Sequence, residues 1–222
     1  MEEKSQTRKK LIRAGIKLFS KYGYAATTTR MIASEAGVNL SAIAFHYSTK
    51  ECLYVACLEY MLGKIKGYYA ASYEEIEEAF QSGTMTPEKA CHFLEKLIDL
   101  QIEVAFVPKY QSTLSLIYWE NNGPEDMRPL SEAVFDRQEH VMADLLQVVA
   151  PVTEERAMIA SRHINGSIIA FGEHRNLTRT YMPDVMEGEE IPFWIRDEIK
   201  GNCLAIVRHL MDPVELPPHL LA

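Results

Sequence analysis

Nine lysine and arginine side chains lie within the first fifty residues, and the chemistry open to them is the binding of anions. Only three acidic residues share this segment, whereas residues 51–222 carry 14 basic and 28 acidic ones. The net charge of −8 therefore hides a segment of +6 followed by a remainder of −14. This asymmetry favours an amino-terminal segment that meets a polyanion and a remainder that phosphates repel.

No catalytic or metal-binding pattern accompanies these charges. The sequence contains no G-x-S-x-G, H-E-x-x-H, G-x-x-x-x-G-K-[ST] or G-x-G-x-x-G motif. Its cysteines (Cys52, Cys57, Cys91 and Cys203) form no C-x-x-C pair and have no histidine at a zinc spacing, so we expect free thiols in a reducing compartment. We expect no enzyme activity, no metal and no cofactor.

The composition is that of an ordinary globular protein, with 47% apolar and 24% charged residues. No apolar run approaches the roughly eighteen residues that a membrane helix needs. The start, residues 1–7, is polar and unlike a secretory signal. We therefore expect a cytoplasmic protein without a membrane partner.

Three helices are predicted to position the basic segment. Apolar residues at helical spacing indicate a first helix over residues 6–22, and Gly23 is suited to end it. Threonine N-caps open a second, short helix that runs to Ala36. Gly37 permits a tight turn, and a third short helix covers residues 40–46. This arrangement is a helix-turn-helix, whose second short helix fits the major groove, about 12 Å wide.

Packing demands within this unit are met by residue size. Ala33 and Gly37 are small where two helices cross, and Val38, Ile43 and Tyr47 are apolar where the unit must be pinned to its core. The opposite face of the third helix is left open and consists of Leu40, Ser41, Ala44 and Phe45.

The rest of the chain is helical by pattern. A capping box at residues 48–51 opens a long helix to about Phe80. Further helices are predicted over residues 87–107, 110–121, 130–150, 154–181 and 193–211. The expected fold is all-α with about nine helices: a three-helix head at residues 1–52 and a helical body at residues 53–222.

The head resembles the TetR family of regulators. The matching residues are Thr27-Thr28-Thr29-Arg30-Met31-Ile32-Ala33-Ser34-Glu35-Ala36-Gly37-Val38, then Phe45-His46-Tyr47 and Lys50-Glu51-Cys52-Leu53. The strong match covers residues 8–55, and residues 37–43 are similar to the branch with CecR-like and PsrA-like regulators. A weaker match to the body of CecR-like proteins lies at residues 163–171.

This resemblance implies contacts with double-stranded DNA. Thr27 and Thr28 would bind phosphate, and Arg30 would reach a base edge. The remaining implied contacts are Ser41, Ala42, Ala44 and Phe45 to bases, and His46, Tyr47 and Lys50 to the DNA backbone. Ala44 stands where the family usually has Tyr or Asn, which puts the operator sequence in doubt.

Structural explanations stay open for several of these residues. His46 is also compatible with a half-buried histidine, Tyr47 with a core residue, and Lys50 with a solubilising charge in the first turn of its helix. The basic stripe of the first helix (Lys10, Arg13, Lys17 and Lys21) is equally compatible with a solvated face.

For the body, the resemblance implies a ligand-sensing and dimerising domain that pairs through its last two helices. The polar and aromatic residues that could line a pocket are Tyr118, Trp119, Glu120, His140, Arg162 and His163. Apolar residues in the same helices indicate a hydrophobic effector. Both groups are equally compatible with ordinary core or surface positions.

The predicted function is that of a homodimeric repressor released from a palindromic operator by a small-molecule effector. Alternatives of the same fold are an activator and a ligand-independent DNA-binding regulator. A third alternative, a helical adaptor that recruits proteins through the basic head, would bind its partner without the steep salt dependence of DNA binding.

Overall fold

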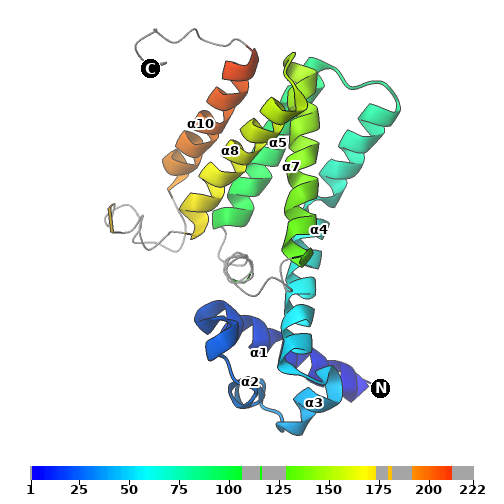
Figure 1. The fold of residues 1–222 in the computed structure, drawn as a ribbon, viewed down its shortest axis with the longest axis vertical. Helices are drawn as coiled ribbons and strands as arrows, with labels where there is room; N and C mark the ends of the chain where they lie inside the picture. The colour runs from blue at the N-terminus through cyan, green and yellow to red at the C-terminus, as the bar shows by residue number, and fades with distance from the viewer. Residues whose placement is uncertain (1, 107–115, 117–128, 174–179, 182–191, 212–222) are drawn as a thin grey trace. The chain divides into compact units, whose positions relative to one another are not determined.

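Helices make up all the regular structure in the described part of the chain. The computed structural model describes residues 2–106, 116, 129–173, 180–181 and 192–211. Within these ranges eight α-helices are assigned (Figure 1), which confirms the all-α prediction. The chain divides into two compact units, Met1–Tyr68 with Val107–Phe135 and Tyr69–Phe106 with Asp136–Ala222.

The first unit contains α1 (Glu2–Ala26), α2 (Thr29–Ala36), α3 (Ser41–Tyr47) and the start of α4 (Lys50–Gln81). The first helix was predicted to end near Tyr22. Gly23 does leave the helical conformation, with φ 75° and ψ 171°, but the helix resumes after this kink and reaches Ala26. The first helix is therefore interrupted at Gly23, where it was predicted to end, and a short helical segment over residues 24–26 follows the kink.

Apolar side chains from all four helices form one core in this unit. Leu11 and Phe19 of α1, Ile32 of α2 and Leu53 of α4 are fully buried. Each lies on the inward face that its helical spacing predicts. This shared core holds α2 and α3 against α1 and α4. Its other members are Ile12, Ala14, Leu18, Ala33, Ile43, Tyr47, Tyr54, Cys57, Leu58, Met61 and Leu116.

The second unit is built from the rest of α4, α5 (Pro87–Phe106), most of α7 (Pro129–Val149), α8 (Glu154–Glu173) and α10 (Phe193–Met211). Thr86 caps α5 as predicted, because its Oγ1 accepts a hydrogen bond from the Lys89 amide at 3.3 Å. The helix predicted over residues 110–121 falls outside the described residues except for position 116, as do residues 174–179 of the one predicted over 154–181.

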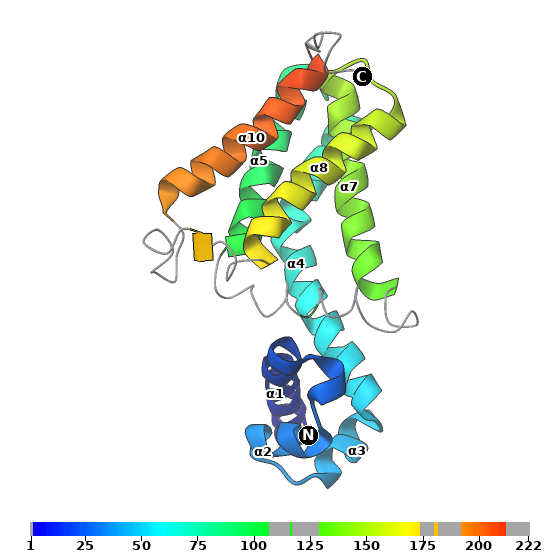
Figure 2. The ribbon, with the colours of Figure 1, turned by 60° about the vertical axis from the view of Figure 1, so that its left-hand side comes forward.

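Helices α5, α8 and α10 pack side by side in this unit (Figure 2). At Gly172 of α8 an added Cβ would stand 2.8 Å from the carbonyl oxygen of Ala105 on α5. The glycine therefore allows these two helix backbones to approach closely. No helix in the described residues has both the length and the hydropathy required to cross a membrane.

Candidate nucleic-acid interface

The turn between α2 and α3 is fixed by backbone geometry. Gly37 adopts the left-handed conformation (φ 64°, ψ 40°), which a side chain would disfavour. Its amide donates to Ser34 O at 3.1 Å, and the next amide, of Val38, donates to Ala33 O at 3.0 Å. At the other end of α2, Thr28 Oγ1 accepts from the Met31 amide at 3.2 Å. Both ends of α2 are therefore capped, and the turn directs α3.

Helix α3 is pinned by one face and leaves the other open. Ile43 is 3% and Tyr47 6% exposed, and the Tyr47 hydroxyl donates to the carbonyl oxygen of Arg8 at 3.2 Å. On the opposite face Ser41 and Ala44 are exposed, and Phe45 is 66% exposed. Ala42, between them, is half-buried and packs partly against the core. We call Ser41, Ala42, Ala44 and Phe45 the recognition face.

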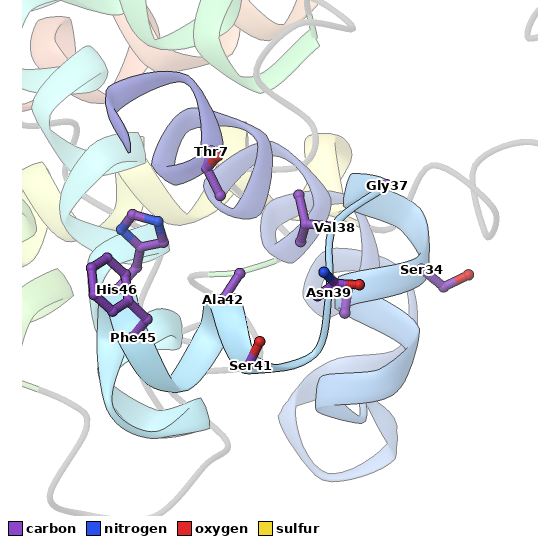
Figure 3. A pocket seen from close by; sticks show the side chains of 10 residues that line it. Thr7, Ser34, Gly37, Val38, Asn39, Ser41, Ala42, Phe45 and His46 are labelled. Atoms are coloured by element: carbon purple, nitrogen blue, oxygen red, sulfur yellow. The ribbon is translucent and has the colours of Figure 1, made fainter. Parts of the chain in front are cut away.

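An open hollow of about 710 Å³ lies beside this face. Figure 3 shows Ser41, Ala42, Phe45 and His46 reaching it from α3, with the rings of Phe45 and His46 together at one end. These two rings meet edge to face with their centres 5.0 Å apart. Three further residues line the hollow, and no site role was predicted for them from the sequence: Thr7 of α1, Ser34 of α2 and Asn39 of the turn.

Of three further predicted DNA contacts, His46 lines this hollow, whereas Thr28 and Arg30 lie at the surface outside its lining. Thr28 and Arg30, at the amino end of α2, are exposed, and His46 is half-buried. The hydroxyl of Thr28 serves its own helix as the N-cap, whereas the Arg30 guanidinium is at the surface, where a base edge or phosphate can reach it. Both the amino end of α2 and the open face of α3 therefore present polar side chains at the surface of the first unit.

Two predicted contacts are corrected by the structure. Thr27 is fully buried, and its hydroxyl donates to Gly23 O at 2.8 Å and lies 3.2 Å from Leu18 O. It closes the end of α1 from within and is not available to a phosphate. Tyr47 is buried as well, because its ring belongs to the core and its hydroxyl is bonded to Arg8.

Lys50 is half-buried, and its ammonium group is bonded within the first unit. The Nζ atom donates to Tyr24 O at 3.0 Å and Thr27 O at 3.1 Å. The basic stripe of α1 also has an internal contact, since Lys17 Nζ lies 2.6 Å from Glu35 Oε1 of α2. These contacts, between residues 18 to 26 positions apart, left no signal in the sequence pattern.

The three predicted pocket residues of the body that the structure describes lie at its surface. His140, Arg162 and His163 have exposed side chains, and Arg162 Nη1 lies 3.1 Å from Glu139 Oε2 at the surface. Because each side chain faces solvent, the structure does not support an interior role for these three. Tyr118, Trp119 and Glu120 lie outside the described residues.

The interior of the second unit instead holds amide side chains that sequence reasoning missed. Gln101 of α5 and Asn165 of α8 are each 5% exposed, and Gln138 of α7 is 6% exposed. Gln138 Nε2 donates to Asn165 Oδ1 at 3.3 Å. Both amide atoms of Gln101 and the Nδ2 of Asn165 have no hydrogen-bond partner among the described residues. Polar residues within apolar helical runs were the only available signal.

Comparison with known proteins agrees with this geometry. The family described as "Bacterial regulatory proteins, tetR family" matches residues 11–57. The HTH-type transcriptional dual regulator CecR of Shigella flexneri is 40% identical over 75 residues, which are 34% of this chain and 33% of that protein. The chain therefore aligns with about a third of this relative.

Two solved structures share the fold over most of the chain. A TetR-family transcriptional regulator from Streptomyces coelicolor has a TM-score of 0.66 at 16% identity, covering 94% of this chain and 97% of that one. The multidrug binding protein EbrR complexed with malachite green has a TM-score of 0.60 at 16% identity, covering 90% and 96%. Residues 11–57 therefore match the DNA-binding domain of the tetR family of bacterial regulatory proteins, and the chain as a whole shares its fold with these TetR-like structures.

Proposed function

We propose that the protein is a repressor that binds a palindromic operator as a homodimer and leaves it when a small molecule binds the second unit. The observation that carries the DNA part is the exposed recognition face, which is presented by a helix whose other side is locked in the core. A rigid helix with an open face can enter the major groove without rearranging.

The roles follow from exposure and chemistry. Arg30 reads a base edge, and a guanine suits it because the guanidinium can donate to two acceptors at once. Ser41 and Ala42 lie against bases, and Ala44 and Phe45 contact thymine methyl groups. Thr28 and His46 approach phosphates, the threonine through the amino end of α2, where helix amides favour an anion.

Homodimerisation is supported by apolar side chains at the surface of the second unit. Ile159 of α8 is 57% exposed, and Phe193 and Trp194 of α10 are 76% and 56% exposed. Exposed large apolar side chains in two adjacent helices favour burial against a second copy. Light scattering should give twice the monomer mass, and Trp194→Glu should shift the protein towards monomer.

Ligand control is supported by the amide of Gln101 and the Nδ2 of Asn165, which have no hydrogen-bond partner among the described residues. An unpaired buried amide costs about 1–3 kcal/mol, so a ligand that pairs it binds favourably. The buried polar residues include no charged side chain among the described residues, which favours an uncharged polar group on an apolar body. EbrR, with the same fold, is known in complex with malachite green.

Selection of duplexes from a random pool tests the DNA part. We expect one palindrome whose half-sites are spaced about 34–36 Å apart, with an affinity that falls steeply as salt rises. Failure to bind any duplex at low salt would contradict the proposal, and so would salt-independent binding, which is the behaviour of a protein-recruiting adaptor.

Effector screening tests the regulatory part. Candidate small molecules are added to the complex of the protein with the selected duplex. A molecule that binds the second unit should lower the affinity for the duplex about 5- to 150-fold. In vitro transcription from a promoter that carries the palindrome then distinguishes a repressor from an activator. Unchanged affinity across a broad library of neutral apolar molecules would contradict ligand control and leave the DNA part standing.

A further inference from the structure

The ammonium group of Lys50 joins the first turn of α4 to the last turn of α1 and to Thr27, which follows it. It donates to the carbonyl oxygens of Tyr24 and Thr27 at 3.0 and 3.1 Å. It also lies 4.0 Å from the centre of the Tyr24 ring, an arrangement with cation–π attraction. Two of its three N–H donors are therefore used within the first unit.

A second bond holds the same tyrosine from the next residue of α4. The Tyr24 hydroxyl donates to Glu51 Oε1 at 2.5 Å. Burial raises the pKa of Tyr24, and the bond to Glu51 raises it further, so the hydroxyl remains a donor. The same bond lowers the pKa of Glu51, so its carboxylate remains an acceptor. We call Tyr24, Lys50 and Glu51 the α4 clamp.

The clamp acts on the amino end of α2. The Thr27 carbonyl that it holds directly precedes Thr28, the N-cap of α2. Thr28 in turn orients the first turn of α2, because its hydroxyl accepts from the Met31 amide and its carbonyl from the Ile32 amide, at 3.2 and 3.1 Å. Arg30 lies within this turn, so its backbone is fixed through Thr27 to α4.

We propose that Lys50 is a positioning residue: it ties the amino end of α2, and with it Arg30, to α4. A displacement of the first turn of α4 then moves Arg30 away from its base, while the core of the first unit stays intact. Lys50 thereby acts through Arg30 instead of supplying an independent phosphate contact. The effect of Lys50 on DNA binding rests on the Arg30 contact proposed above. The link that Lys50 makes between α4 and the amino end of α2 does not depend on that contact.

Amide hydrogen exchange in the absence of DNA tests the tie directly. Lys50→Met keeps an unbranched apolar side chain, one atom shorter, and removes the ammonium, and Lys21→Met removes one exposed charge elsewhere in the head as the matched control. We expect the Ile32 amide to exchange about five- to tenfold faster in Lys50→Met, since lost hydrogen bonds are worth about 1 kcal/mol. Equal exchange rates in the two variants would overturn the proposal.

Operator binding tests the functional consequence. Lys50→Met should lower the affinity for the operator, and its log K should depend on log salt as it does in Lys21→Met. The loss of affinity caused by Lys50→Met should be smaller when Arg30→Ala is already present. If the slope of log K against log salt falls by about 0.9 more in Lys50→Met than in Lys21→Met, Lys50 contacts a phosphate and the positioning role is wrong. The role is also wrong if Lys50→Met lowers affinity as much in the Arg30→Ala background as in the wild-type protein.

A third variant covers the case in which Lys50→Met does not fold. Lys50→Arg keeps the charge but replaces the compact ammonium by a planar fork. Faster Ile32 exchange in this variant supports the tie, and wild-type exchange overturns it. If no duplex is bound by the wild-type protein, the proposed function fails, yet the exchange measurement still decides whether Lys50 positions α2.

Discussion

Gly15 on α1 faces Cys57 on α4 so closely that a Cβ atom at Gly15 would stand 2.7 Å from Cys57 Sγ. Cys57 is fully buried, and its thiol lies 3.6 Å from the carbonyl oxygen of Ile12. The sulfur therefore has little room to withdraw. The approach of α1 to α4, which the α4 clamp also needs, depends on the absence of a side chain at position 15.

Replacing this glycine should destabilise the first unit. We expect Gly15→Ala to lower the free energy of unfolding by about 1–3 kcal/mol, because it overpacks a filled core. Gly67→Ala is the control: Gly67 lies in α4 with nothing within 4 Å of an added Cβ, so alanine should stabilise by about 0.5–1 kcal/mol. Urea unfolding measures both, and a Gly15→Ala protein as stable as wild type would refute the close contact.

Thr27 should matter for stability and not for DNA contact. Thr27→Val keeps the shape and removes the hydroxyl that bonds Gly23 O, which should cost about 1–3 kcal/mol. Ser20→Ala removes a less buried hydroxyl from α1 and should change stability by less than about 0.5 kcal/mol. Anisotropy with folded Thr27→Val should give wild-type operator affinity; a tenfold loss would restore Thr27 as a phosphate contact.

Removing the unpaired amide of Gln101 should stabilise the second unit. Gln101→Leu replaces a buried polar group that has no partner in the part of the chain that the structure describes, so the free energy of unfolding should rise by about 1–3 kcal/mol. Gln81→Leu, at an exposed position of α4, should change it by less than about 0.5 kcal/mol. Thermal and urea unfolding compare the two, and a destabilised Gln101→Leu would show that the amide is satisfied.

His140 should titrate above its ordinary range. Its Nδ1 lies 2.8 Å from Asp136 O, and this bond, followed by the charges of Asp136, Asp144 and Glu154, raises its pKa above 6.5. Since the folded-state pKa is raised, the stability it contributes is full below pH 6.5 and is lost as pH rises through the folded pKa.

Proton NMR of the imidazole measures this pKa directly. Asp136→Asn should retain most of the increase in the pKa of His140, because the largest cause of this increase is the hydrogen bond to the main-chain carbonyl of Asp136. Titration at or below pH 6.5 in the wild-type protein would exclude the bond.

Local patterns were enough to predict the helices, and distant contacts decided the roles of individual side chains. The spacing of apolar residues and the Gly37-Val38 turn predicted α2, α3 and the open face correctly. Thr27 and Lys50 both look like phosphate donors in the sequence, but their partners lie 4 to 26 residues away. Likewise, nothing local marks Gln101 as a buried amide without a partner.

The central claim is that the recognition face of α3 meets DNA. Ala44→Glu places a carboxylate on that face at an exposed position where it fills no core space. Ala71→Glu makes the same change at an exposed helical position of α4, in the second unit. Both variants should retain wild-type unfolding curves, so they differ only in where the charge is added.

Anisotropy with the selected palindrome at one fixed salt concentration is the most direct measurement. We expect Ala44→Glu to weaken binding by at least about tenfold, or about 1.4 kcal/mol, and Ala71→Glu to bind within about twofold of wild type. If Ala44→Glu binds as tightly as Ala71→Glu, the recognition face does not touch DNA and the account is wrong.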